Sequence, residues 1–146
     1  MNNSEILFRS KHISKLYIEY MAPICSSYNL TQMEVNVIAF LHNNPKYDTA
    51  SDIVNYRMLS KSNVSTAVEN LIKKKILCKK ADETDRRKAH LILNQCDEIT
   101  ASIVAMQLKF VKTVLSGFTQ EDKRIFFRYL EQIDNNIISN IDNLGE

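Results

Sequence analysis

The chain has 146 residues, of which 45% are apolar and 25% are charged, and its formal net charge is +2. That length suits one domain with helical extensions, and only two glycines and two prolines favour long helices over a strand-and-turn architecture. No apolar run approaches the roughly 20 residues needed to span a bilayer. The N-terminus also lacks the basic start and apolar block of a signal peptide. We therefore expect a cytoplasmic protein with no membrane association.

The spacing of the cysteines and histidines disfavours a disulfide framework, a metal site and a catalytic site. The cysteines are odd in number, with no CxxC pair, and are expected to be reduced thiols: Cys25, Cys78 and Cys96. The three histidines lie in different predicted elements without HxxxH spacing: His12, His42 and His90. With no glycine-rich phosphate loop either, we predict no metal, no cofactor and no enzymatic activity.

The first predicted helix runs from Glu5 to about Ile24. Its apolar residues fall on one helical stripe: Ile6, Ile13, Leu16, Tyr17, Tyr20, Met21 and Ile24. Pro23 predicts a kink or an approaching end of this helix. Cys25 lies at the C-terminal end, where the helix dipole disfavours a thiolate, so an inert thiol is favoured over a redox sensor.

Two Thr-x-x-acid sequences predict the starts of the next two helices. Thr31 to Glu34 predicts a capping box, and the helix that it opens should end at Asn43-Asn44-Pro45. Thr49 to Asp52 opens a short third helix, and Ser60 is a good N-cap for a fourth. Two helices joined by a tight connection, the second with a polar outer face, predict a helix-turn-helix.

The predicted helix 60–74 has one apolar face and one polar face. Val64, Val68, Leu71 and Ile72 share the apolar face. The other face carries short polar side chains and one cation that can reach phosphates and base edges: Lys61, Ser62, Asn63, Ser65, Thr66 and Asn70. The lysines at 73–75, at the far end of the helix, are predicted to reach phosphate at most.

A basic hairpin is predicted after this helix. An apolar run begins at Ile76, residues 89–93 alternate as a half-buried strand does, and the polar tip at 82–88 lies between them. Residues 61–88 hold nine lysines and arginines against four aspartates and glutamates, a net charge of +5, so the rest of the chain sums to −3. A basic segment on a mildly acidic body indicates polyanion binding. Simple solvation of these charges is the alternative, and the adjacent polar helix face argues against it.

Two further helices are predicted after the hairpin. Residues 94–97 can cap a long helix bearing apolar positions from Ile99 to Leu115, which 116–118 interrupts. Thr119 to Asp122 then starts a last helix with a long apolar stripe: Phe126, Leu130, Ile133, Ile137 and Ile141. No later element covers that stripe, so the first and last helices are predicted to form a dimer interface.

The sequence NVSTAVENLIKKKIL followed by the wing ETDRRKAHLIL, with long helices on both sides, resembles the MarR (multiple antibiotic resistance regulator) family over essentially the whole chain. The most specific match is Asp85-Arg86-Arg87 before an alternating strand. The chain departs from the family at Lys75, Asn94 and Asp97, where glycine, threonine and glycine are usual; a left-handed Lys75 would be strained. The resemblance implies intertwined termini of two subunits, two wings straddling a pseudo-palindrome, and pockets for phenolic or other amphipathic compounds.

The predicted fold is mainly α, a winged helix-turn-helix with a two-stranded β-wing and long N- and C-terminal dimerisation helices. Residues 1–30 and 97–146 form the predicted helical dimerisation region, and residues 31–96 form the predicted DNA-binding lobe. The predicted partners are double-stranded DNA and a second copy of the chain, with a small-molecule effector left open.

The predicted function is a dimeric DNA-binding transcriptional regulator, a repressor in preference to an activator. Its helix would read the major groove of a pseudo-palindromic operator and its wing the minor groove. Asp85 would orient the wing arginines. The predicted DNA-binding residues are Ser60, Lys61, Ser62, Asn63, Ser65, Thr66, Asn70, Asp85, Arg86, Arg87 and Lys88. The alternative is a winged-helix module that binds an acidic protein partner.

A candidate effector pocket is also suggested by the sequence. Four residues of the first two helices could line it: Tyr17, Tyr20, Met21 and His42. A tyrosine and methionine stripe at helical spacing is also typical of ordinary core packing. Both interpretations stay open at this point.

Overall fold

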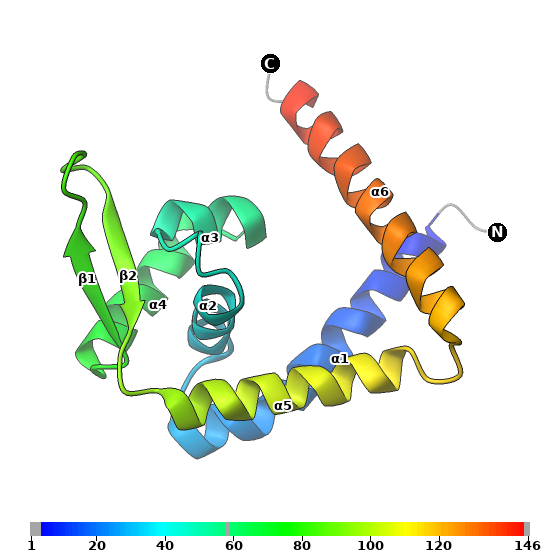
Figure 1. Cartoon of the computed structure of the whole chain (residues 1–146), viewed down its shortest axis with the longest axis horizontal. Helices are drawn as coiled ribbons and strands as arrows, with labels where there is room; N and C mark the ends of the chain where they lie inside the picture. Colours follow the sequence, from blue (N-terminus) through cyan, green and yellow to red (C-terminus); the bar gives the residue numbers. More distant parts are fainter. Residues whose placement is uncertain (1–3, 58, 145–146) are drawn as a thin grey trace. The chain divides into compact units, whose positions relative to one another are not determined.

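The computed structural model describes residues 4–57 and 59–144. In chain order, these residues form six helices and two strands (Figure 1): α1 (Glu5–Tyr28), α2 (Gln32–Asn43), α3 (Ala50–Arg57), α4 (Lys61–Lys73), β1 (Leu77–Ala81), β2 (Ala89–Leu93), α5 (Asp97–Val114) and α6 (Gln120–Leu144). This confirms the predicted mainly α winged helix-turn-helix fold. Two compact units result, one ending at Phe110 and the other beginning at Val111. Within those described ranges, every helix is too short or too polar to cross a membrane.

The core of the first unit is organised around α2. Val35, Val37 and Ile38 have no exposed surface, as is typical of aliphatic side chains in a core. Buried side chains from the neighbouring elements complete the core: Met21, Ile24, Ile53, Val64, Leu71, Leu77, Leu91 and Ile103. The helix-turn-helix and the wing therefore share one hydrophobic core with α1 and the start of α5.

The helix starts follow the predicted capping chemistry. The Thr31 hydroxyl accepts a hydrogen bond from the Glu34 amide at 3.1 Å, and the Glu34 carboxylate accepts one from the Thr31 amide at 3.0 Å. Thr49 and Asp52 make the same reciprocal pair at the start of α3. Each box satisfies amides that have no partner within the helix.

The end of α1 differs from the prediction. Pro23 lies inside the helix, which continues to Tyr28, whereas the sequence predicted an end at about Ile24. Met21 and Ile24, on either side of the proline, are buried in the core. The helix ends instead at Asn29, which is left-handed with φ 52°, and the Leu30 amide donates to the Cys25 carbonyl. Burial on both sides of Pro23 offsets the loss of one backbone hydrogen bond.

The end of α4 has the strained cap that the departure from glycine predicted. Lys75 has φ 62°, a conformation that costs a side-chain-bearing residue about 1–2 kcal/mol. The Ile76 amide donates to the Leu71 carbonyl, and the Asn94 side chain donates to the Lys75 carbonyl. These bonds hold the chain in the left-handed turn that leads from the helix into β1.

The two strands form an antiparallel hairpin whose register pairs Leu77 with Leu93 and Ala81 with Ala89. Leu91 faces the core, whereas Ile92 on the opposite face is exposed, as the alternation predicted. The backbone between α2 and α3 also pairs with β2, because the Leu91 amide donates to the Asp48 carbonyl at 2.7 Å. The wing is thus attached to the helix-turn-helix along its second strand.

The second unit contains the last turn of α5 and the long helix α6. Gly117 takes φ 82°, a conformation open to glycine, at the predicted break. Thr119 and Asp122 form the predicted reciprocal cap. The face of α6 exposes a row of large apolar side chains: Phe127, Leu130, Ile133, Ile137, Ile138 and Ile141.

Candidate nucleic-acid interface

The helix-turn-helix presents the polar face of α4 to solvent. Its apolar face is buried through Val64, Val68 and Leu71, together with Ala67. The Ser60 hydroxyl accepts a hydrogen bond from the Asn63 amide, so the helix begins where the sequence predicted. The predicted contact residues that the structure exposes on this helix are Ser60, Lys61, Ser62, Asn63, Ser65 and Thr66, whereas Asn70 is half-buried.

One row of exposed side chains on α4 includes a residue that the sequence pattern did not single out. At helical spacing, Ser62, Thr66, Glu69 and Lys73 share the face opposite the buried residues, and all four are exposed. Glu69 is an unexpected member because an acidic side chain repels phosphate. A carboxylate can still accept a hydrogen bond from the amino group of cytosine. In the sequence, the spacing of Glu69 from Thr66 was the signal that could have placed Glu69 on this face.

A groove of about 280 Å³ runs between α3 and α4. The predicted residues Lys61 and Ser65 line one side, and Ser51 and Asn55 of α3 line the other. The two serines, the asparagine and the lysine offer hydrogen-bond donors with no carboxylate among them, which suits contact with a phosphate backbone. Ser51 and Asn55 were not predicted, because the sequence indicates α3 only as a support for the next helix.

The wing turn is held by carboxylates. Asp82 Oδ1 accepts hydrogen bonds from the amides of Thr84 and Asp85, and also from the Thr84 hydroxyl. The Asp85 amide, then the His90 ring and Thr84, hold the pKa of Asp82 well below its usual range. Asp85 in turn accepts from the Arg87 amide at 3.0 Å and lies 3.5 Å from the Arg87 guanidinium. The predicted orienting role of Asp85 therefore has a geometric basis for Arg87.

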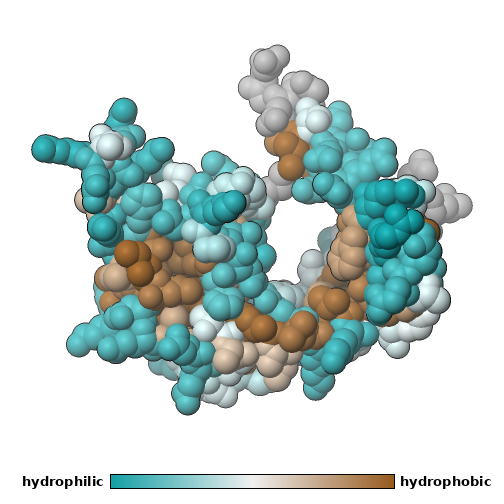
Figure 2. All heavy atoms as spheres, viewed as in Figure 1, coloured by the Kyte–Doolittle hydropathy of each residue, from teal (hydrophilic) through white to brown (hydrophobic). Residues whose placement is uncertain are grey.

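The basic residues of the wing turn extend into solvent. Arg86, Arg87 and Lys88 are exposed, with the Arg87 side chain 94% accessible. Hydrophilic side chains gather at the tip of the hairpin in Figure 2, beyond the apolar base of the sheet. An ion pair as exposed as Arg87 with Asp85 contributes little stability, so the arginine is available to another anion.

Lys74 has a role different from the predicted phosphate contact. Its Nζ lies 2.7 Å from the carboxylate of Glu34, which is 1% exposed, and 2.7 Å from the Asn29 carbonyl. The lysine thus neutralises a buried carboxylate and joins the end of α4 to the start of α2. The sequence prediction of a phosphate-holding Lys74 is replaced by this internal contact, whereas Lys73 is exposed and keeps the predicted role.

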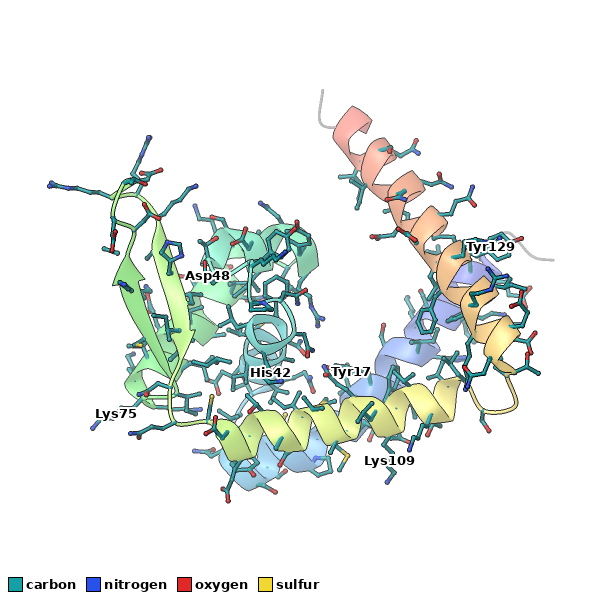
Figure 3. All side chains as sticks on the ribbon, in the orientation of Figure 1. Tyr17, His42, Asp48, Lys75, Lys109 and Tyr129 are labelled. Carbon is teal, nitrogen blue, oxygen red and sulfur yellow. The ribbon has the colours of Figure 1, made fainter. Side chains whose placement is uncertain are left out.

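A cavity of about 380 Å³ lies among α1, α2, the end of α3 and α5. Of the four predicted pocket residues, Tyr17, labelled in Figure 3, lines the cavity. Its ring packs edge-on against Phe110. Tyr20 contacts the same phenylalanine, but Met21 is buried in the core and His42 is exposed elsewhere on α2. The lining also contains polar residues that the sequence did not indicate, namely Gln32, Asn36 and Arg57.

The surroundings of Cys25 disfavour thiol reactivity. Burial raises the pKa of the Cys25 thiol, which keeps it protonated, in agreement with the predicted position at the end of α1. In the ranges 4–57 and 59–144, no three histidine, cysteine, aspartate or glutamate side chains are grouped to hold a metal ion.

A helix-turn-helix with an exposed polar second helix, followed by a basic hairpin, defines a winged-helix protein of the nucleic-acid-binding type. Residues 28–88, which include the helix-turn-helix, β1 and the wing turn, match the model of the MarR family. This match agrees with the resemblance to the MarR family that the sequence suggested. Among curated proteins, no sequence matches the chain significantly.

Solved structures support the same fold over the whole chain. A MarR protein from Peptoclostridium difficile is 20% identical, with a TM-score of 0.82, over 96% of this chain and 92% of that one. MepR of S. aureus, solved with DNA, is 17% identical, with a TM-score of 0.73, over 93% and 99%. BpsR of Bordetella bronchiseptica, described as regulated in its DNA binding by 6-hydroxynicotinic acid, is 15% identical, with a TM-score of 0.70, over 89% and 98%.

Proposed function

We propose that this protein is a dimeric repressor that binds a pseudo-palindromic operator. The observation that carries the proposal is the pairing of an exposed polar face on α4 with a basic wing on the same unit. The N-terminal end of α4 would enter the major groove, where Ser62, Asn63 and Thr66 can form hydrogen bonds with base edges. The wing arginines would enter the adjacent minor groove. MepR, which shares the fold, has been solved with DNA.

DNA binding also agrees with the charge of this surface. The segment 61–88 carries a net charge of +5, although Lys74 uses its charge internally. The remaining exposed cations lie on α4, on β1 and at the wing turn, so they can follow a duplex backbone. Such a role would place the protein with the chromosome, in keeping with the predicted cytoplasmic location.

The alternative is binding to an acidic protein, and salt dependence distinguishes the two. For duplex DNA we expect the logarithm of the binding constant to fall linearly with the logarithm of salt concentration, with a slope of about −0.9 for each neutralised phosphate. Gel shifts or fluorescence anisotropy with genomic fragments at several salt concentrations measure that slope. Absence of binding to any fragment at low salt would contradict the proposal and favour the protein-interaction module.

Asn63 is expected to contribute to sequence preference. The Asn63→Ala variant should narrow the difference in affinity between the operator and random DNA by about 1–3 kcal/mol, because alanine cannot form hydrogen bonds with a base edge. Lys73→Ala is the matched control, since removing a cation that faces phosphate should weaken binding to both DNAs equally. A Lys73→Ala variant that changed the preferred sequence, with Asn63→Ala neutral, would contradict this placement of α4.

The dimer is proposed to form through the terminal helices. The stripe on α6 exposes Leu130, Ile133, Ile137 and Ile141, and exposed apolar side chains in a continuous row are typical of an interface. On α1, Ile6, Leu7, Phe8 and Ile13 are exposed as well. The division into a dimerisation region of 1–30 and 97–146 and a DNA-binding lobe of 31–96 stays a prediction that rests on these two surfaces.

An Ile133→Asp substitution tests this interface. A carboxylate placed in the centre of an apolar contact must lose its hydration, so we expect the dimer to dissociate at micromolar concentration. Sedimentation velocity measures the change, with Asn136→Asp on the same helix as the charge-matched control. An Ile133→Asp protein that remained dimeric, or a wild-type protein that sedimented as a monomer, would contradict the proposal.

The cavity beside Tyr17 supports binding of a small-molecule effector. Tyr17 and Phe110 supply aromatic surface, Gln32 and Asn36 supply amides, and Arg57 supplies a cation. Such a lining favours an anionic aromatic compound, because a guanidinium binds a carboxylate and the rings contact an aromatic plane. The regulation of BpsR by 6-hydroxynicotinic acid, which is an aromatic acid, gives a precedent on the same fold.

A further inference from the structure

His90 of β2 lies between two carboxylates that come from different parts of the chain. Its Nδ1 is 2.7 Å from Asp48 Oδ1, and its Nε2 is 2.8 Å from Asp82 Oδ2. Asp48, labelled in Figure 3, belongs to the connection between α2 and α3, whereas Asp82 follows β1 at the base of the wing turn. The ring therefore bridges the body of the helix-turn-helix and the turn of the wing.

The geometry requires a proton on each ring nitrogen. Ionised carboxylates only accept hydrogen bonds, and a neutral imidazole has one N–H, so only the imidazolium can donate to both aspartates. Both hydrogen bonds are then charge-assisted, the stronger kind. The two carboxylates lie on opposite nitrogens of the ring, an arrangement that fits a proton-dependent bridge and does not converge on a metal ion.

The bridge continues from Asp82 to the wing arginines. The second oxygen of Asp82 accepts hydrogen bonds from Thr84 and Asp85, and Asp85 holds the Arg87 amide and guanidinium. A continuous set of contacts thus runs from Asp48 through His90 to the turn that carries Arg87. The wing has a second attachment, the backbone bond from the Leu91 amide to Asp48, which does not depend on pH.

We propose that His90 is a positioning residue for DNA binding: its imidazolium holds the wing turn against the α2–α3 connection, and loss of its proton releases the turn and weakens binding. The inference rests on the proposed function, because the wing is taken to contact DNA. His90 does not touch the nucleic acid in this proposal. It acts through Asp82 and the turn that orients the arginines.

The direction of the pH dependence follows from the contacts. Hydrogen bonds to Asp48 and then to Asp82 raise the pKa of His90 above its ordinary value, and the His90 bond helps to lower that of Asp82. A raised histidine pKa gives stability that is complete below about pH 6.5 and is lost as the pH rises through the folded-state value. The lowered pKa of Asp82 gives stability that is complete above about pH 4 and is lost on acidification. The bridge should be intact between these limits.

Other charged groups near the ring act in both directions. Lys80 is the cross-strand partner of His90 and opposes its protonation, whereas Glu83 and Asp52 favour it. The remaining charged side chains that line the two hollows beside the ring are cationic: Lys46, Lys79, Arg87 and Lys88. None of these replaces either carboxylate at hydrogen-bond distance in the contacts described above.

NMR titration of the free protein tests the protonation state directly. Because its two ring nitrogens face carboxylates, we expect His90 to keep a proton on both nitrogens to a higher pH than an ordinary histidine. The protection of the Thr84 and Asp85 amides, relative to their intrinsic exchange rates at each pH, should fall as His90 loses its proton. A His90 that titrates at the ordinary histidine value of about 6.5 would overturn the proposal.

A second experiment measures the affinity of the protein for a duplex operator fragment from pH 6 to pH 9 at constant ionic strength. Wild-type affinity should fall about tenfold across the titration of His90, a coupling of ordinary size. His90→Gln should flatten the profile, and Asp48→Asn should shift the fall to lower pH because it removes one carboxylate while keeping an acceptor. The Arg86→Ala/Arg87→Ala variant should lose the pH dependence, since the coupling runs through the wing.

Several outcomes contradict the inference. A tenfold fall that persists in His90→Gln, or a wing variant with an undiminished pH profile, would assign the effect to another group. If His90→Gln does not fold, the Asp48→Asn profile decides, and an unshifted profile overturns the proposal. A protein that binds no DNA at any pH would overturn the proposed function, whereas the titration and amide exchange of the free protein would still decide whether the bridge controls the wing.

Discussion

A Lys74→Met variant is expected to lose about 2–3 kcal/mol of unfolding free energy. Removing one member of a buried ion pair typically costs about 3–5 kcal/mol, because the other charge stays buried without its partner. Glu34 would keep only the Thr31 amide, and the Asn29 carbonyl would lose its donor. The Lys74 side chain is 33% exposed, so water partly compensates, and we place the loss below the fully buried range. Urea denaturation monitored by circular dichroism measures it.

Two variants separate this effect from a general loss of charge. Lys73→Met removes the same charge from the exposed neighbour and should change stability by less than about 0.5 kcal/mol. The Glu34→Gln/Lys74→Met pair should recover at least half of the loss, because the amide still accepts from Thr31 and no buried charge is left. If Lys74→Met were as stable as Lys73→Met but bound DNA more weakly, Lys74 would be a phosphate contact, as the sequence had suggested.

The sequence was informative where a contact spans three or four residues. The threonine–acid caps at 31–34, 49–52 and 119–122 are all present, because the partners are fixed by the geometry of one helical turn. The alternation of residues 89–93 identified the core-facing Leu91 for the same reason. Even the left-handed Lys75 followed from a local comparison with the glycine that usually ends this helix.

Contacts between distant residues could not be predicted in this way. Lys74 and Glu34 are 40 residues apart, and nothing in a run of three lysines indicates which one turns inward. His90 was assigned no role because its partners, Asp48 and Asp82, come together only when β2 pairs with the α2–α3 connection. Arg57 beside Tyr17 is a similar case, since the cavity is formed by four separate helices. The charge pattern of the sequence indicates a basic surface. The tertiary contacts decide which of its charged side chains remain available to a ligand.

The wing arginines should account for a large share of DNA affinity. Arg86 and Arg87 are exposed at the hairpin tip, and Arg87 gives up only a solvent-exposed pair with Asp85 when it binds another anion. In a dimer, two wings carry four such guanidinium groups. A narrow minor groove concentrates negative potential and favours arginine there, so their removal should cost more than that of an ordinary surface charge.

We therefore expect Arg86→Ala/Arg87→Ala to weaken operator binding about 10- to 100-fold near physiological salt and to reduce the log–log salt slope by about one for each phosphate that is no longer neutralised. Anisotropy titrations at four salt concentrations measure both quantities. Lys11→Ala/Lys15→Ala, on the exposed surface of α1, removes the same net charge and should change the slope little. Arg86→Lys/Arg87→Lys should keep most of the slope but lose affinity, because an ammonium preserves the charge and lacks the planar guanidinium. An unchanged slope and affinity in the alanine variant would show that these arginines are solvated surface, and the basic wing would then have no part in holding DNA.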